Sequence, residues 1–142
     1  MEVLKGNEEE VRWFVGEEGP WAGSVGGALR LVLGAGPRVA IATRGGSGAA
    51  LAWREPEGDR YAEIPALRVP AAEWIDSTGC GDAFTSGFLL GSLRGMSTLE
   101  SALVGSVLAA AVCKTSGLRA LRALPVPSVP SALRSGVRVS NL

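Results

Sequence analysis

Apolar and polar positions follow two different periods in the first half of the chain. Short apolar runs of small and β-branched residues predict strands, and apolar residues at every third or fourth position predict helices. The strands are expected at 1–7, 38–46, 48–55 and 60–70, and the helices at 8–16 and 21–36. The run at 38–46 is apolar without a break from Val39 to Ala42 and ends in glycines, which is typical of a strand buried on both faces of a parallel sheet.

The second half of the chain is mainly helical in its pattern. One helix is expected at 82–93 and another at 98–117, with Ser97 or Thr98 as its N-cap and Gly117 as its stop. Three prolines within six residues begin the last segment, so 126–142 is expected to be a loosely ordered tail after an ordered domain at 1–125. The alternation of strands and helices predicts a three-layer α/β fold, or part of one.

Composition limits the possible functions. The length of 142 residues suits one domain, and 14 basic residues balance 14 acidic ones, so charge favours neither nucleic acid nor an anionic membrane as partner. The chain has no histidine, which excludes catalysis by histidine and metal sites with histidine ligands. Its two cysteines form no CxxC pair, and it opens without a hydrophobic signal region. A cytoplasmic location is therefore expected.

The segment TGCGD, residues 78–82, leads directly into the helix expected at 82–93. A helix N-terminus has unpaired N–H groups, and glycines let the backbone approach a ligand closely, so this is a candidate phosphate or oxyanion site. The carboxylate of Asp82 beside it is a candidate general base, which is the equipment for phosphoryl transfer to an alcohol. The alternative is a plain loop in which Asp82 only caps the helix.

Three segments together resemble the ribokinase-like (PfkB) carbohydrate kinases, over nearly the whole chain. DSTGCGDAFTSGFL, at 76–89, is similar to the signature D-T-x-G-A-G-D-x-F of that family. LKGNEEE, at 4–10, resembles the K-P-N-x-x-E element, and IATRGGSGAAL, at 41–51, resembles the T-x-G-x-x-G element. They occur in the family's order and at plausible spacing.

The resemblance implies a role for each matching residue. It makes Asp82 the base that takes the proton of the acceptor hydroxyl. The family's other functional positions correspond to the anion hole (Gly79, Cys80, Gly81), nucleotide contacts (Thr43, Gly45, Asn7, Gly117), water-mediated Mg²⁺ binding (Asn7, Glu10) and a monovalent-cation site (Asp76 with the carbonyl of Thr78). The implied cofactors are ATP, Mg²⁺ and, in many members, K⁺, and the implied substrate is a sugar or nucleoside.

Gly6 stands where proline is usual in the family, and Cys80 stands where alanine is usual. The resemblance implies a three-layer α/β/α ribokinase-like fold with a Rossmann-like, mostly parallel sheet. It covers only the C-terminal half of the family's longer domain, which implies pairing with an N-terminal half or a homodimer. Three functions follow: an ATP-dependent sugar or nucleoside kinase, a non-catalytic nucleotide-binding or interaction remnant, and a relative of the pyridoxal and hydroxymethylpyrimidine kinases. A dinucleotide-binding enzyme is disfavoured because GSVGGA, at 23–28, follows no strand.

Overall fold

The computed structural model describes residues 2–16, 23–115 and 128–142. They form two compact units, the first made of Met1–Pro65 with Val137–Leu142 and the second of Ala66–Gly136. The expected end of the ordered domain at residue 125 and the expected helix stop at Gly117 both lie outside the described residues. In the part of the chain that the structure describes, no helix is long and apolar enough to cross a membrane.

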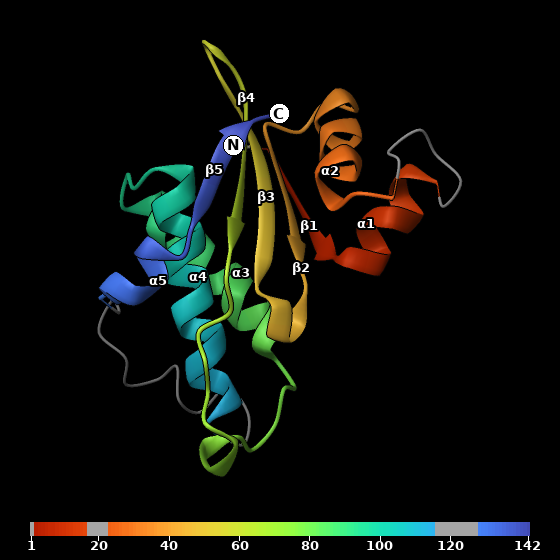
Figure 1. Ribbon diagram of the computed structural model, residues 1–142. Coiled ribbons are helices and arrows are strands. Elements are labelled where there is room, and N and C mark those ends of the chain that lie inside the picture. Colours follow the sequence, from red (N-terminus) through yellow and green to blue (C-terminus); the bar gives the residue numbers. More distant parts are fainter. Residues whose placement is uncertain (1, 17–22, 116–127) are drawn as a thin grey trace. The chain divides into compact units, whose positions relative to one another are not determined.

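The first unit is built on a five-stranded sheet in the order β1–β2–β3–β4–β5 (Figure 1). Its strands are β1 Val3–Asn7, β2 Val39–Thr43, β3 Ala49–Glu55, β4 Gly58–Ile64 and β5 Arg138–Asn141. Only β1 and β2 pair in parallel, and the other pairings are antiparallel. The described sheet is thus mixed rather than mostly parallel. The reason is that residues 44–48 and 56–57 are connections too short for a crossover, so they can join only antiparallel neighbours.

Helices α1 (Glu8–Val15) and α2 (Val25–Gly34) form the crossover from β1 to β2 and cover one face of this sheet (Figure 1). Alternate residues of β2 and β3 face them, because side chains of a strand alternate between its two faces. Those strand residues are alanines, which pack against larger apolar side chains of the helices; the core consists of Ala40, Ala42, Ala50, Ala52, Val11, Ala28, Leu29, Val32 and Leu33. Ile41 and Leu51 point to the opposite face and are also buried, which confirms that β2 is buried on both sides.

The end of the chain differs from the expected loosely ordered tail. Residues Ser131–Ser135 form the short helix α5, and β5 pairs with β4 over four residues. Arg60 Nη1 donates to Asn141 Oδ1 at 3.1 Å, and the N–H of Leu142 donates to the carbonyl of Asp59 at 3.0 Å. The prolines end at Pro130, so every residue of β5 keeps an N–H for the ladder and can extend the sheet at the free edge of β4.

The second unit contains two long helices, α3 (Cys80–Leu93) and α4 (Thr98–Cys113), which lie side by side and antiparallel. The Ser97 side chain caps α4, accepting from the N–H of Glu100 at 3.2 Å, as the sequence predicts. The helices pack almost backbone to backbone, since a Cβ built on Gly87 would lie 2.7 Å from Cα of Gly105. Gly87 and Gly91, which are four residues apart on one face of α3, thus allow this close approach.

Candidate active site

In the first unit, the expected nucleotide and Mg²⁺ residues gather at one edge of the sheet. Asn7 ends β1, Thr43 ends β2, and the two are register partners in the parallel pairing. The hydroxyl of Thr43 donates to the carbonyl of Gly6 at 3.4 Å, which ties the two strand ends together. Parallel strands end at the same edge of a sheet, and ligands of α/β proteins bind beyond the carboxyl ends of such strands.

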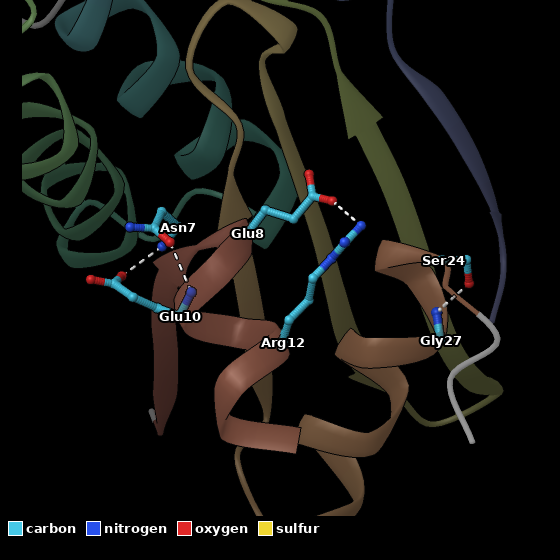
Figure 2. A network of polar contacts seen from close by, with 6 residues as sticks. All are labelled: Asn7, Glu8, Glu10, Arg12, Ser24 and Gly27. Atoms are coloured by element: carbon cyan, nitrogen blue, oxygen red, sulfur yellow. Dashed lines mark hydrogen bonds and ion pairs between the residues drawn. The ribbon is translucent and has the colours of Figure 1, made fainter. Parts of the chain in front are cut away.

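Asn7 and Glu10 form a reciprocal pair at the start of α1, which Figure 2 shows. Asn7 Oδ1 accepts from the N–H of Glu10 at 2.8 Å, and the N–H of Asn7 donates to Glu10 Oε2 at 2.7 Å. This is a capping box, and the N-x-x-E spacing of the sequence is also the signal for it. Both side chains are exposed, and Glu10 Oε1 takes no part in these two bonds. Both residues thus have a structural role in capping α1, and Glu10 Oε1 remains available for another contact.

Gly45 follows the end of β2 in a tight loop. Its φ is +54°, in the region that favours glycine, and the loop closes when the N–H of Arg44 donates to the carbonyl of Gly48 at 2.8 Å. Nothing lies within 4 Å of a Cβ built on Gly45 or on Gly46. The loop therefore presents bare backbone to the solvent, as close approach of a ligand requires.

Arg44, in the same loop, belongs to a polar chain that the sequence did not single out. Its guanidinium lies 3.7 Å from the carboxylate of Glu63, which accepts from the hydroxyl of Tyr61 at 2.7 Å. Burial, followed by this hydrogen bond, raises the pKa of Tyr61. No sequence signal marks these three residues, because they meet only through the pairing of β3 with β4 and the turn after β2.

In the second unit, α3 begins differently from the other long helices. The side chains of Asn7, Ser24 and Ser97 cap α1, α2 and α4, whereas the N-cap of α3 is Gly79, with φ +83° and no side chain to offer. The N–H of Cys80 donates to the carbonyl of Ser77 at 3.1 Å. Within the described residues the N–H groups of Gly81 and Asp82 make no hydrogen bond. These two donors, at the positive end of the helix dipole, remain available to an anion.

Asp82 lies in the first turn of α3 and is exposed. Its carbonyl accepts from the hydroxyl of Ser86 at 2.9 Å, but its carboxylate has no hydrogen-bond or ion-pair partner in the described part of the chain. The carboxylate does not cap the helix, so the plain-loop interpretation loses its main support. It is free to accept a proton or hydrogen bond from a substrate.

Asp76 shapes the loop that precedes α3. Its Oδ1 accepts from the N–H of Thr78 at 3.0 Å and from the hydroxyl of Thr78 at 2.9 Å. The backbone hydrogen bond, followed by the side-chain one, lowers the pKa of Asp76, so the group is a carboxylate at neutral pH. The N–H groups of Ile75 and Asp76 donate to the carbonyl of Cys113, at 2.9 and 3.4 Å, which fastens the loop to the end of α4.

Cys80 and Cys113, distant in sequence, meet in the structure. Both are free thiols, and Cys113 lies close enough to Cys80 to affect its pKa. Burial, followed by the neighbouring Cys113 thiol, raises the pKa of Cys80 to about 12, so Cys80 is a protonated thiol at neutral pH and lacks the lowered pKa of a catalytic cysteine. No group of three or more cysteine, aspartate or glutamate side chains that could hold a metal ion occurs among the described residues. Cys80 thus belongs to the site through its position in the turn.

The expected site residues fall into two groups, one in each unit. The first unit brings together Asn7, Glu10, Thr43 and Gly45, and the second brings together Asp76, Thr78, Gly79, Cys80, Gly81 and Asp82. Gly117, the remaining expected nucleotide contact, lies outside the described residues.

Comparison with known proteins places the chain in a family. Residues 1–124 match the family described as pfkB family carbohydrate kinase. Over 117 residues the chain is 34% identical to a cytidine kinase of Thermococcus kodakarensis, and the match takes in 82% of this chain and 38% of that kinase.

Two solved structures share the fold. A ribokinase of Thermotoga maritima has a TM-score of 0.70 at 22% identity, covering 88% of this chain and 39% of its own. A ribokinase of Arabidopsis thaliana, solved with ribose and ATP, has a TM-score of 0.64 at 25% identity, covering 82% of this chain and 36% of its own. The chain spans about two fifths of the length of these proteins and has the ribokinase-like α/β fold that its sequence predicts. Because the family match takes in residues 1–124, the chain belongs to the pfkB family of carbohydrate kinases.

Proposed function

We propose that the protein transfers a phosphoryl group from ATP to a hydroxyl of a sugar or nucleoside, with the phosphate at the start of α3. The observation that carries this proposal is that the N–H groups of Gly81 and Asp82 and the carboxylate of Asp82 have no partner in the described part of the chain. Family membership supports the reaction class, and the names of the relatives, a cytidine kinase and two ribokinases, support the acceptor class.

In this proposal Asp82 is the general base. Its carboxylate accepts the proton of the acceptor hydroxyl while that oxygen forms a bond to the γ-phosphorus and the bond from phosphorus to the bridging oxygen of ADP breaks. The turn Gly79–Gly81 brings the helix N–H groups to the transferring phosphoryl oxygens and stabilises their charge. The N–H of Cys80 is already bonded to Ser77, so Gly81 and Asp82 supply the free donors.

The first unit is proposed to hold the nucleotide and its metal. Mg²⁺, bound with the ATP phosphates, neutralises part of their charge. The residues present fit it, because Mg²⁺ keeps several waters and needs only one or two carboxylates, and Glu10 Oε1 is not used by the capping box. Thr43 and the bare loop at Gly45 are proposed to contact the nucleotide, together with Gly117. A K⁺ site at Asp76 and the Thr78 carbonyl belongs to the same proposal, and the ionised state of Asp76 supports it.

A non-catalytic nucleotide-binding role is the second candidate. The match covers only 38% of the cytidine kinase, and acceptor contacts can come from the remainder of such a domain, which favours this candidate. In that case the chain binds ATP but turns over no acceptor. The relatives named above favour a sugar or nucleoside over a pyridoxal or hydroxymethylpyrimidine acceptor.

The test is ADP release from MgATP with a panel of sugars and nucleosides, ribose and cytidine included. Asp82→Asn should lower the rate by about 10² to 10⁴, the range for loss of a general base, while ATP affinity stays within about twofold. Asp59→Asn is the matched control, because it is the same substitution in the hairpin of β3 and β4. A normal rate in Asp82→Asn would remove Asp82 from its role. ATP binding without turnover of any acceptor by the unaltered chain would support the non-catalytic candidate instead.

A further inference from the structure

We propose that Cys80 and Cys113, the chain's only two cysteines, form an intramolecular disulfide under oxidising conditions. The link would join the first residue of α3 to the last residue of α4. The disulfide would lie next to the proposed phosphate site, but its formation does not depend on the proposed function.

The packing register of α3 against α4 brings the two cysteines to the same end of the helix pair. Gly87 of α3 lies against Gly105 of α4, and Gly91 lies against Ser101. Each step of four residues forward in α3 therefore matches a step of four backward in α4, as antiparallel helices require. Two further turns toward the start of α3 bring Cys80 opposite the last turn of α4, where Cys113 ends the helix.

Side-chain contacts agree with this register. Cys80 packs against the cluster of Ala83, Leu108 and Val112, so its side chain faces the end of α4. Val112 of this cluster directly precedes Cys113, so the Cys80 side chain packs against the turn of α4 that ends in Cys113. The carbonyl of Cys113 is held by the N–H groups of Ile75 and Asp76. Both cysteines thus lie at the same end of the helix pair, and the proposed disulfide joins segments that are already packed together.

Unequal exposure sets the order of the reaction. Cys80 is half-buried and Cys113 is buried, so an external small-molecule disulfide such as oxidised glutathione meets Cys80 first. The Cys80 sulfur attacks one sulfur of the oxidant, and one glutathione leaves as a thiol. The Cys113 sulfur then attacks the Cys80 sulfur, and the second glutathione leaves. The two protons of the protein thiols end on the two glutathiones, so the protein is oxidised by two electrons and the oxidant is reduced by two.

The link would also stabilise the helix pair. It would close a loop that contains all of α3 and α4 except their linked ends, and it would restrict the unfolded state of this segment. The native packing of Gly87 on Gly105 is far from the linked ends and should not change.

The experiment incubates the full reduced chain with graded ratios of oxidised to reduced glutathione, blocks free thiols with iodoacetamide and digests it with trypsin without reduction. Cleavage after Arg94 separates peptide 69–94, which holds Cys80, from peptide 95–114, which holds Cys113. The two peptides should be found linked, in a monomeric chain whose mass has fallen by two hydrogens, and reduction should separate them. Cys113→Ser, the matched control, should instead accumulate glutathione on Cys80.

Several results would overturn the proposal. Two alkylated cysteines at the highest ratio, glutathione that persists on Cys80 of the unaltered chain, or a disulfide-linked dimer would each do so. The thermal midpoint gives a second readout, because the oxidised chain should unfold at a higher temperature than the reduced one and Cys113→Ser should show no such rise. A lower midpoint after oxidation would mean that the disulfide distorts the fold, which contradicts a native position of the two cysteines that suits the link.

Discussion

Asn7 and Thr43 are register partners at the carboxyl ends of the parallel strands β1 and β2. The N-x-x-E and T-x-G segments, separated in sequence by two helices, therefore end at the same edge of the sheet. The bond from the Thr43 hydroxyl to the Gly6 carbonyl fixes that edge. The arrangement gives the first unit a place for a nucleotide and its metal, and it lets the structural and the proposed binding roles of single residues be separated.

Asn7 should contribute to stability through its cap alone. Asn7→Ala removes the acceptor for the Glu10 N–H, so the free energy of unfolding should fall by about 1 kcal/mol. Asn7→Asp keeps a side-chain acceptor and should lose much less. Urea unfolding of the three proteins measures this, and equal losses in both variants would mean that the cap is not the cause.

Glu10 allows the cap and the carboxylate to be tested apart. Glutamine also serves in a capping box, so Glu10→Gln should keep the free energy of unfolding within about 0.5 kcal/mol while removing the charge proposed to act on hydrated Mg²⁺. We expect the Mg²⁺ concentration needed for ATP binding to rise. Titration of Mg²⁺ at fixed ATP, followed by calorimetry, measures this.

Glu9→Gln is the matched control for that variant. Glu9 is exposed in the same helical turn, so its substitution removes the same charge near the same helix end. If Glu9→Gln raised the required Mg²⁺ concentration as much as Glu10→Gln, general electrostatics at the start of α1 would account for the effect and the specific role of Glu10 would be refuted.

Gly87→Ala should destabilise the helix pair. The added Cβ would lie 2.7 Å from Cα of Gly105 and 2.9 Å from the carbonyl oxygen of Val104, and backbone atoms cannot move aside as a flexible side chain can. We expect a loss of about 1–3 kcal/mol in the free energy of unfolding. Gly34→Ala is the control, because that helical glycine has nothing within 4 Å of an added Cβ and should be neutral or slightly stabilising. Similar losses in both variants would contradict the close packing.

Asp76 should make stability depend on pH in the acidic range. Its pKa is lowered in the folded state, so its contribution is fully present above the unfolded-state pKa of about 3.9 and is lost as the pH falls through the lower folded-state pKa. Asp76→Asn should therefore be less stable than the unaltered chain at neutral pH, and the difference should shrink in acid. Urea unfolding over this pH range checks it. A difference that does not vary with pH would point to a cause other than ionisation.

Much of the local structure could be predicted from the sequence. The apolar run at 38–46 and the turn between β3 and β4 carry their own signals, as does the N-cap at Ser97. The glycine pair 87 and 91 indicated a close helix contact because its spacing puts both residues on one face of α3. The group of residues at the start of α3 was likewise visible, since it is contiguous in sequence.

The features that the sequence did not reveal depend on contacts between distant segments. The pairing of β5 with β4 is one, because the prolines before it dominate the local pattern. The proximity of Cys80 and Cys113 is another, since it follows from the register in which α3 packs against α4. The N-x-x-E pattern of Asn7 and Glu10 fits both a capping box and a family element. Only the structure shows that the two residues hydrogen-bond to each other as a capping box.

The most direct measurement is a thermal unfolding scan of the purified chain with and without MgATP. A ligand that binds only the folded state stabilises it by about 2.7 kcal/mol at a hundredfold excess over Kd. We expect one cooperative transition whose midpoint rises with MgATP and rises less in Glu10→Gln. A cooperative transition that MgATP leaves unmoved would contradict the assignment of a nucleotide site to this chain.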